Sequence, residues 1–506
     1  MLQYVNNEDR LACFCEVGMS HPAFQCELND ETMFYSLIGV LLLYLWCLQV
    51  SVVQCVQPKL NSIEHDVLKT LYESTGGSSG GWNYDSIKNC LSTSGNVGKN
   101  LIGRNWNFTK NASTGAFLHD PCQNEATFTK PFTGIFCECD DVSCFITYLG
   151  LICGNLKGPL PSQLGMLTNL GALYLYNNSL SSTIPKELGN LVNIQEITMF
   201  ENALTGPIPN ELGNLTKMQL LGLYSNSLSS TIPAQLGNLQ ENLNFLALQY
   251  NVLTGTIPME LSYLTNMLTL ALFSNKLSGS IPREFGKMIK MQQLALYSNG
   301  LSGTIPGEFS NLKNIVNLAL QQNFLSGSIP KGLGELVQME QLDLSNNTLR
   351  GTIISEFGLL PALRDLSLSN NFLTGSIPQE LVNLKNLSKL LLQNNSLVTS
   401  SISKSAFSFI SPSNFTKLTA LDISNNELSG TIAESVFQLP ALEIFAAGSN
   451  CFSGILPSNI CHSSTLKTLA ISGLSTGDSC KVYYWKDSVF SSVFGFSGFS
   501  SKHFME

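Results

Sequence analysis

Charged residues are scarce in this chain. Only 12% of its 506 residues are Asp, Glu, Lys or Arg, whereas 44% are hydrophobic. The 27 basic and 36 acidic residues give a formal net charge of −9, and the basic residues form no run. Such a chain has no electrostatic footprint for nucleic acid or for an anionic membrane surface, and its apolar content excludes wholesale disorder. We therefore expect a folded protein, too long for one compact domain, with no nucleic-acid partner.

Patterns of catalysis and metal binding are also missing. The sequence has no HExxH, no phosphate-binding Gly loop and no kinase catalytic segment. Residues 77–81 and 473–477 match the GxSxG pattern of hydrolases, but neither string joins a strand to a helix in an alternating βα pattern. The only histidines after residue 55 are His65, His119, His462 and His503. We therefore expect no enzyme, no cofactor and no bound metal.

One long hydrophobic run is present, near the amino terminus. Residues 33–53 are uncharged and apolar, which is long enough for a signal sequence or a membrane-spanning helix. Small residues at Val53 and Cys55 favour cleavage that leaves an amino terminus near Val56, although no basic segment precedes the run. The alternative is an uncleaved anchor, but the acidic segment 1–32 opposes a cytoplasmic placement of that flank. In both cases we expect the chain after the run to lie outside the cytosol.

Cysteine is confined to the two ends of the remaining chain. Nine of the 14 cysteines follow residue 55, and none occurs between Cys153 and Cys451. This usage favours disulfides in an oxidising compartment. Cys137 and Cys139 could instead bind a metal, but no His lies near them and their spacing is too short for zinc. Because nine is odd, at least one thiol stays free or pairs with another chain.

Internal repetition is the strongest signal in the sequence. The segment LxLxxNxLxGxIP recurs with a period of about 24 residues, and repetition at such a period is the signature of a stacked architecture. Two spacings are longer, from Leu221 to Leu246 and from Leu390 to Leu421. Thirteen copies are clear, and a degenerate fourteenth starts at Leu469. The first positions of the clear copies are Leu149, Leu173, Ile197, Leu221, Leu246, Leu270, Leu294, Leu318, Leu342, Leu366, Leu390, Leu421 and Phe445.

Each copy predicts a strand, a turn and a return segment. In the LxL part alternate residues point to opposite sides, so the leucines enter the core and the residues between them face solvent. The Asn of each copy, such as Asn299, can satisfy backbone groups of its own and neighbouring copies, which predicts a buried asparagine ladder. Only the first copy differs, with Gly154 at this position. Because no single copy can bury its own leucines, the copies must stack.

These repeats resemble the plant-type extracellular leucine-rich repeat family. The resemblance rests on segments such as Leu277-Ser-Gly-Ser-Ile-Pro282 and Leu373-Thr-Gly-Ser-Ile-Pro378, and it covers about residues 145–480. It implies an α/β solenoid, a right-handed leucine-rich-repeat superhelix of about 13 to 14 repeats, each of roughly 24 residues. It also implies a concave parallel β-sheet, short 3₁₀ segments on the convex side and a second, smaller sheet made by the LxGxIP segments.

The segments before the repeats resemble the amino-terminal cap of the same family. Residues 66–77 match its opening amphipathic helix, and Asp120-Pro-Cys122 and Phe132-Thr-Gly-Ile-Phe-Cys137 match its two cysteine elements, with Phe132 in place of a tryptophan. The resemblance implies a disulfide between Cys122 and Cys137. Cys461 and Cys480 are expected to close the other end of the solenoid in the same way.

The outward-facing strand residues form the candidate binding surface. In repeats two to seven, five of the six residues at the second outward position are aromatic. With strands about 4.8 Å apart, these rings would form a continuous apolar stripe. The second half of the surface carries Ser, Asn and Gln instead, with two acids, Asp343 and Asp422. The alternative is that the rings only support one another. The candidate ligand-binding residues are Tyr174, Tyr176, Phe200, Tyr224, Gln249, Tyr250, Phe273, Tyr297 and Gln321.

Eight sequons fit a glycosylated extracellular chain. They predict N-linked glycans at Asn107, Asn111, Asn177, Asn214, Asn346, Asn386, Asn394 and Asn414. Two of them, Asn177 and Asn394, lie at strand ends, where a glycan would crowd a ligand.

The chain divides into five predicted parts. They are an amino-terminal extension at 1–32, a signal peptide or signal anchor at 33–55, a cysteine-containing cap at 56–144, leucine-rich repeats with a carboxy-terminal cap at 145–480, and a Ser/Phe/Gly-rich tail at 481–506.

The resemblance implies a secreted or cell-surface recognition module. Like receptor-like ectodomains of surface signalling or defence, it would bind a peptide, protein or glycan on the concave face, with a membrane co-receptor as a further partner. Two other classes stay open. One is an inhibitor of a secreted cell-wall hydrolase, similar to the polygalacturonase inhibitors, and the other is a structural adhesion protein.

Overall fold

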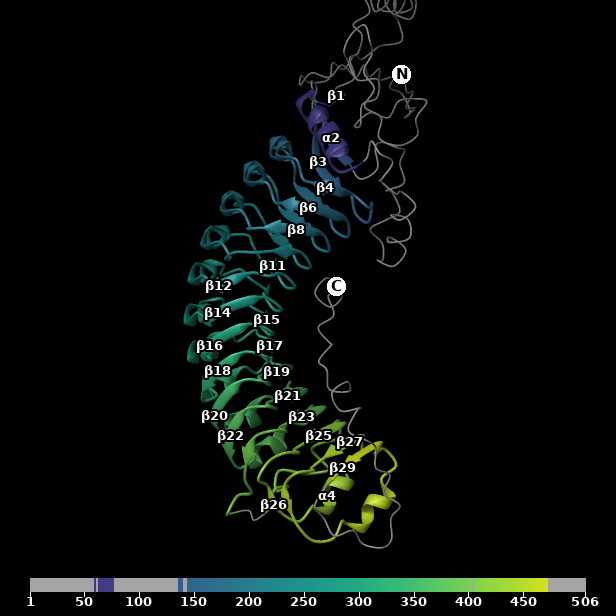
Figure 1. Cartoon of the computed structure of the whole chain (residues 1–506). Coiled ribbons are helices and arrows are strands. Elements are labelled where there is room, and N and C mark those ends of the chain that lie inside the picture. Colours follow the sequence, from purple (N-terminus) through teal and green to yellow (C-terminus); the bar gives the residue numbers. More distant parts are fainter. Residues whose placement is uncertain (1–58, 61, 77–134, 140–142, 403–404, 472–506) are drawn as a thin grey trace, which may run out of the picture.

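The chain forms a curved solenoid in which successive repeats stack along an arc (Figure 1). This computed structural model describes residues 59–60, 62–76, 135–139, 143–402 and 405–471. The predicted extension, signal or anchor segment, tail and both GxSxG strings therefore lie outside the described residues. So do Cys122, Cys480 and the sequons at Asn107 and Asn111.

A long sheet lines the concave side of the arc, and its repeat strands are parallel and in register. Inward positions pair across repeats, so that Leu270 lies opposite Leu294, which in turn lies opposite Leu318. The strands that carry the fourteen predicted copies are β3 (Ser143–Gly150), β5 (Ala172–Tyr174), β7 (Glu196–Thr198), β9 (Leu220–Gly222), β11 (Phe245–Ala247), β13 (Thr269–Ala271), β15 (Gln293–Ala295), β17 (Asn317–Ala319), β19 (Gln341–Asp343), β21 (Asp365–Ser367), β23 (Lys389–Leu391), β25 (Ala420–Asp422), β27 (Ile444–Ala446) and β29 (Thr468–Ala470). The predicted concave sheet is confirmed.

The LxGxIP segments form further parallel strands, as expected. They fall into three sheets, with breaks close to the two longer repeats, those that start at Leu221 and Leu390. The strands are β4 (Lys157–Pro159), β6 (Ser179–Thr183), β8 (Ala203–Gly206) and β10 (Ser227–Leu228), then β12 (Thr254–Thr256), β14 (Lys276–Ser280), β16 (Gly300–Thr304), β18 (Phe324–Gly327), β20 (Thr348–Thr352), β22 (Phe372–Gly375) and β24 (Ser396–Leu397), and finally β26 (Ser429–Gly430) and β28 (Cys451–Phe452).

Short helices return the chain on the convex side. A proline precedes most of them, because its fixed φ suits the residue before the first turn. The 3₁₀ helices are η3 (Ser162–Met166), η4 (Lys186–Asn190), η5 (Asn210–Asn214), η6 (Ala234–Leu239), η7 (Met259–Tyr263), η8 (Arg283–Lys287), η9 (Gly307–Asn311), η10 (Lys331–Glu335), η11 (Ser355–Leu359), η12 (Gln379–Asn383) and η13 (Ser458–His462), and one α-helical turn is α4 (Glu434–Phe437).

One continuous hydrophobic core runs through the solenoid, from Val67 in the cap to Phe452 near its far end. Beside it lies the predicted asparagine ladder. Asn299 shows the pattern: its side-chain amide donates to the carbonyls of Leu296 and Leu272 at 3.1 Å, and its oxygen accepts from the Leu277 N–H at 3.0 Å. Each such Asn therefore fastens its own repeat to the one before it.

The cap joins the first repeat directly. Helix α2 (Ser62–Ser74) buries Val67, Leu68 and Leu71, and strands β1 (Lys59–Leu60) and β2 (Ile135–Cys139) both pair with β3. The buried carboxylate of Glu64 accepts the Ile146 N–H at 2.8 Å. Burial raises the pKa of Glu64, and this hydrogen bond partly offsets the rise. The expected cap helix is present and begins a few residues before the predicted stretch.

Four of the described cysteines are disulfide-bonded: Cys137, Cys144, Cys153 and Cys461. The predicted pairings with Cys122 and Cys480 stay predictions, because those two partners are outside the described residues. Cys451 is free and exposed.

The insertion that lengthens the repeat after Leu390 folds onto the solenoid. Phe407 and Phe409 are buried there, and Phe407 stacks on Phe452 with ring centroids 5.4 Å apart. The extra residues therefore extend the core.

Candidate concave binding surface

Each repeat strand places two side chains on the concave face, on either side of its second inward leucine. The first is small in four successive repeats, where it is Ala247, Ala271, Ala295 and Ala319. The second is the predicted aromatic position. Rings at the second position pack over the alanines, so that Phe273 and Tyr297 form one apolar cluster with three of these alanines. The small residues give the rings room to lie against the sheet.

The rings form two stacks. In the first, Tyr176, Phe200 and Tyr224 lie nearly parallel, with centroids 4.4 and 4.3 Å apart. In the second, Phe273 stacks on Tyr297 at 4.1 Å, and Tyr250 meets Phe273 edge-on at 5.1 Å.

The prediction of one continuous stripe is therefore wrong. Gln249 occupies the aromatic position between Tyr224 and Phe273, so the first and second stacks belong to separate apolar clusters. A glutamine side chain offers no ring face to continue the stacking.

Most of the predicted contact residues are also buried. Phe200, Tyr224, Gln249, Phe273, Tyr297 and Gln321 are all at most 9% exposed. Tyr174 and Tyr176 are half-buried, and Tyr250 is 47% exposed. Tyr250 is the most accessible ring of the predicted set, because it belongs to the left-handed position that follows the strand, with φ of 54°.

The tyrosines at the amino-terminal end of this face are tied to acids. The Tyr174 hydroxyl donates to the Glu196 carboxylate in a short hydrogen bond, and Tyr148 meets the Tyr174 ring edge-on at 5.3 Å. Burial, together with the Glu196 charge, raises the pKa of Tyr174 and of Tyr148, so both stay protonated. Burial likewise raises the pKa of Tyr176 and Tyr224, to which the Glu201 charge adds.

The second half of the face is polar. Asp343 and Asp422 occupy the first outward position, and burial raises the pKa of both carboxyl groups, to about 6 for Asp343. Several acceptor oxygens on this face have no hydrogen-bond partner within the described part of the chain. They are Gln249 Oε1, Gln321 Oε1, Asp343 Oδ2 and Gln393 Oε1.

The described sequons fall into two groups. Asn177, Asn214, Asn346 and Asn394 are exposed. Asn386 and Asn414 are only half-exposed, and their side-chain amides donate to the carbonyls of Pro361 and Val382.

Asn386 also belongs to a second ladder that the sequence analysis missed. On the convex edge, residues such as Asn193 donate to a carbonyl of the preceding repeat, here Thr168 at 2.9 Å, and accept from a lysine of the next, here Lys217 at 2.7 Å. The recurrence of Asn at this place in Asn193, Asn242, Asn266, Asn314 and Asn386 is the signal that could have revealed it.

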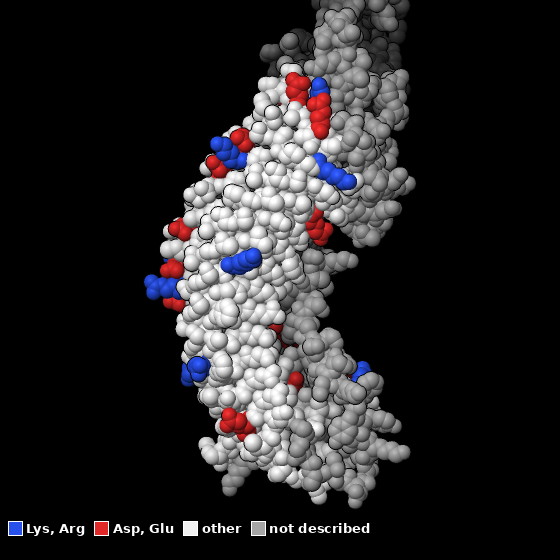
Figure 2. Space-filling view, in the orientation of Figure 1, with Lys and Arg blue, Asp and Glu red and all other residues white. Residues whose placement is uncertain are grey.

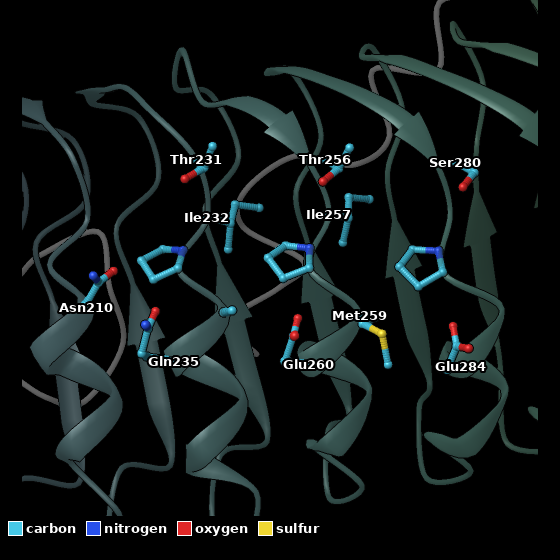
Figure 3. Close-up of a pocket in the computed structure, with 14 residues that line it drawn as sticks. Asn210, Thr231, Ile232, Gln235, Thr256, Ile257, Met259, Glu260, Ser280 and Glu284 are labelled. Carbon is cyan, nitrogen blue, oxygen red and sulfur yellow. The ribbon is translucent and has the colours of Figure 1, made fainter.

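Shallow grooves lie on the flank, between the second sheets and the starts of the 3₁₀ helices. Figure 3 shows one of about 670 Å³, where Thr231, Thr256 and Ser280 form one row and Gln235, Glu260 and Glu284 another. A groove with equivalent residues lies at Pro185 and Pro209. Equivalent residues of successive repeats line both grooves, so the grooves result from the stacking of similar repeats.

The visible face of the solenoid is mostly uncharged, with acidic and basic side chains standing singly or in small groups (Figure 2). Among the residues that the structure describes, no group of three His, Cys, Asp or Glu could hold a metal ion. Within those same ranges, no helix is long and apolar enough to cross a membrane.

Comparison with known proteins identifies the repeats. A sequence profile described as Leucine Rich Repeat matches residues 169–191, 290–312, 338–360, 362–384 and 417–439. No curated protein matches the chain.

Three solved structures illustrate the likeness. The leucine-rich-repeat ectodomain of the membrane receptor kinase GASSHO1/SCHENGEN3 from Arabidopsis thaliana, in complex with CASPARIAN STRIP INTEGRITY FACTOR 2, is 34% identical over 64% of this chain and 40% of its own, with a TM-score of 0.55. The plant peptide hormone receptor RGFR1, in complex with RGF2, is 31% identical over 65% and 59%, with a TM-score of 0.53. The leucine-rich repeat protein LIC12759 of Leptospira interrogans is 31% identical over 65% of this chain and 79% of its own, with a TM-score of 0.53.

The chain thus spans 40% and 59% of the two plant receptor structures that it resembles. The repeat unit, the asparagine ladder, the second sheets and these matches agree. The chain belongs to the leucine-rich repeat family, and its repeats are similar to those of plant receptor ectodomains.

Proposed function

We propose that this chain is an extracellular, receptor-like recognition module that binds a peptide along its concave face. The observation that carries the proposal is the exposed ring of Tyr250, which meets the second of the two buried aromatic stacks on the concave sheet. Exposed rings on a rigid surface are the side chains that most often anchor a ligand. The peptide-binding plant receptors among the similar structures support the same ligand class.

Under this proposal the site comprises Tyr174, Tyr176, Phe200, Tyr224, Gln249, Tyr250, Phe273, Tyr297 and Gln321. Tyr250 and Tyr176 contact the peptide directly, whereas the buried rings of Phe200, Tyr224, Phe273 and Tyr297 hold the surface in shape. A receptor of this kind acts at the cell surface and passes its signal through a membrane co-receptor.

A matched pair of tyrosines tests the proposal. Tyr250 and Tyr263 belong to the same repeat and are 47% and 45% exposed, but Tyr263 lies in η7 on the convex side. Peptides are selected from a random linear library displayed on phage, using the full secreted chain, and their affinities are measured by calorimetry. We expect Tyr250→Ala to weaken binding at least about tenfold, since aromatic anchors commonly contribute about 2 kcal/mol or more.

Tyr263→Ala should leave that affinity unchanged. Equal loss in both variants, or loss in Tyr263→Ala alone, would place binding away from the concave face. If no peptide is selected but the chain inhibits a cell-wall polygalacturonase, the inhibitor class replaces the receptor-like one.

A further inference from the structure

Asp343 is a buried carboxylate that lacks a partner for one of its oxygens. Asp343 is 4% exposed. Its Oδ1 accepts a hydrogen bond from the Ser345 N–H at 2.9 Å, whereas its Oδ2 has no hydrogen-bond partner within the described chain. The hydroxyls of Ser345 and Ser367 lie near enough to moderate its pKa, but neither is placed to donate to Oδ2. Burying a carboxylate without a neighbouring cation costs free energy, because the group loses its hydration and few protein hydrogen bonds replace it.

Asp422 provides an internal comparison. It occupies the same place in its own repeat, with the same Asp-x-Ser sequence, and it is 3% exposed. Its Oδ1 accepts from both the N–H and the hydroxyl of Ser424, at 3.0 and 2.6 Å. Both bonds of Asp422 end on Oδ1, and its Oδ2 is not among the buried atoms without a partner, whereas Oδ2 of Asp343 is.

The neighbours of Asp343 are small residues and one further acceptor. Across the sheet it pairs with Ala319 on one side and Ser367 on the other, both small. One repeat earlier, Gln321 Oε1 is also buried without a hydrogen-bond partner among the described residues. The one charge that perturbs the Asp343 carboxylate is that of Asp365, which has the same sign. Within the described chain, Asp343 forms no ion pair with a Lys or Arg.

We infer that Asp343 is the anchor for an arginine side chain of the concave-face peptide. This rests on the proposed function, and it adds the chemistry of the ligand. A guanidinium group carries five donors in a planar fork and matches a carboxylate better than a point charge does. Asp343 Oδ2 and Gln321 Oε1, supplied by neighbouring repeats, give that fork two acceptors.

The test uses variants that keep the repeat intact. Asp343→Asn is unsuitable for a secreted chain, because it would create an Asn-Leu-Ser sequon. Asp343→Ser instead gives Leu-Ser-Leu-Ser, the sequence that the next repeat already has at 366–369. Asp422→Ser is the matched control, since it removes a buried carboxylate from the same place in another repeat.

The probe is the set of peptides selected on the wild-type chain, each resynthesised with citrulline in place of one arginine. Citrulline has nearly the shape of arginine but no charge. We expect the citrulline peptide to bind the wild-type chain at least about thirty times more weakly, the lower end of the range for breaking a buried, hydrogen-bonded charge pair. Asp343→Ser should lose as much affinity for the arginine peptide and should no longer distinguish the two peptides. Asp422→Ser should behave like the wild type.

The outcomes separate this inference from the proposed function. If selected peptides depend on Tyr250 but need no arginine, or if Asp343→Ser still distinguishes arginine from citrulline, the inference falls and the peptide-binding function stands. If no selected peptide depends on Tyr250, both fall. A thermal melt of Asp343→Ser that is no lower than that of the wild type at neutral pH excludes misfolding as the cause of lost binding.

Discussion

At the scale of single residues, each repeat turns at two positions where the backbone is left-handed. The residue before the ladder Asn is left-handed in repeat after repeat, with φ of 53° at Ser274 and Ser298. The glycine of LxGxIP is left-handed as well, and in two repeats Ser182 and Ser230 hold the same conformation with φ of 71° and 70°. An L-residue at such a φ costs about 1 to 2 kcal/mol, so the stacking must stabilise the repeats by more than this.

The ladder gives the first prediction. Asn299→Leu should lower the free energy of unfolding by roughly 1 to 3 kcal/mol, because it leaves the Leu277 N–H unpaired in the interior and removes one of the two side-chain donors of the Leu272 carbonyl, the other being Asn275. Urea denaturation measures the change. Asn314→Leu is the control, since Asn314 donates from an exposed place on the convex edge. Equal effects of the two changes would refute the ladder argument.

The second prediction concerns the left-handed glycine of the LxGxIP segment. A Cβ on Gly279, whose φ is 76°, would lie 2.8 Å from the Thr256 methyl carbon. Gly279→Ala should therefore destabilise the chain by at least about 1 to 2 kcal/mol. Gly307→Ala should be neutral or stabilising by up to about 1 kcal/mol, because Gly307 has open space and ordinary helical φ. Thermal melts of the two variants decide the point.

The third prediction concerns Asp343 and pH. Because the folded pKa of Asp343 is raised to about 6 from 3.8, the unfolded state binds fewer protons between about pH 4 and pH 6. The contribution of Asp343 to stability is therefore present below about pH 4 and lost as pH rises through 6. The free energy of unfolding of Asp343→Ser, relative to that of the wild type, should thus be higher at pH 7.5 than at pH 4, by up to about 3 kcal/mol. Chemical denaturation at the two pH values provides the test. A pH-independent difference would show that the carboxyl group titrates normally.

At the scale of elements, the concave rings act as stacked units rather than as separate side chains. Phe273 is 1% exposed and contacts Tyr250 and Tyr297. Removing such a ring therefore acts on the fold as well as on a ligand. The sequence-based expectation that the residues between the inward leucines face solvent misses this second packed layer.

Phe273→Ala is consequently predicted to destabilise the solenoid by roughly 3 to 5 kcal/mol, the range for deleting a buried phenylalanine ring. Tyr250→Ala should cost less than about 1.5 kcal/mol, because its ring is half in solvent. Equilibrium unfolding followed by circular dichroism compares the two. Similar losses in both variants would mean that the second stack is loosely packed.

At the scale of the whole molecule, the repeats form one continuous body. The core and the parallel sheet run from the cap to the last repeats, and the asparagine ladder runs without a gap from Asn178 to Asn450. In such a stack each repeat is stabilised mainly by its two neighbours. The concave surface is therefore rigid, which suits a ligand that must lie along several repeats.

The last prediction concerns the secreted protein. If the chain is extracellular, mass spectrometry should find an amino terminus near Val56 and glycans at the exposed sequons Asn177, Asn214, Asn346 and Asn394. Asn386 should be less modified than these four, because it is only half-exposed and both polar atoms of its side chain are engaged, the amide with Pro361 and the oxygen with Lys417. Peptide mapping before and after glycosidase treatment provides the measurement. Detection of residues 1–32 in extracellular material would exclude the cleaved signal.

The repeat architecture was readable from the sequence alone because it is periodic. A constant period determines which leucines enter the core, which Asn forms the ladder and where the chain turns, so the sheet and the family followed without coordinates. What the tertiary structure decided is how neighbouring repeats share space on the concave face. Whether Phe273 is covered, whether Gln249 interrupts the stacks and whether Asp343 finds a donor depend on contacts between residues of adjacent repeats. Those contacts exist only once the strands lie side by side. The residue pattern tells which side of the sheet a side chain points to, but not which side chains of the adjacent repeats fill the space around it.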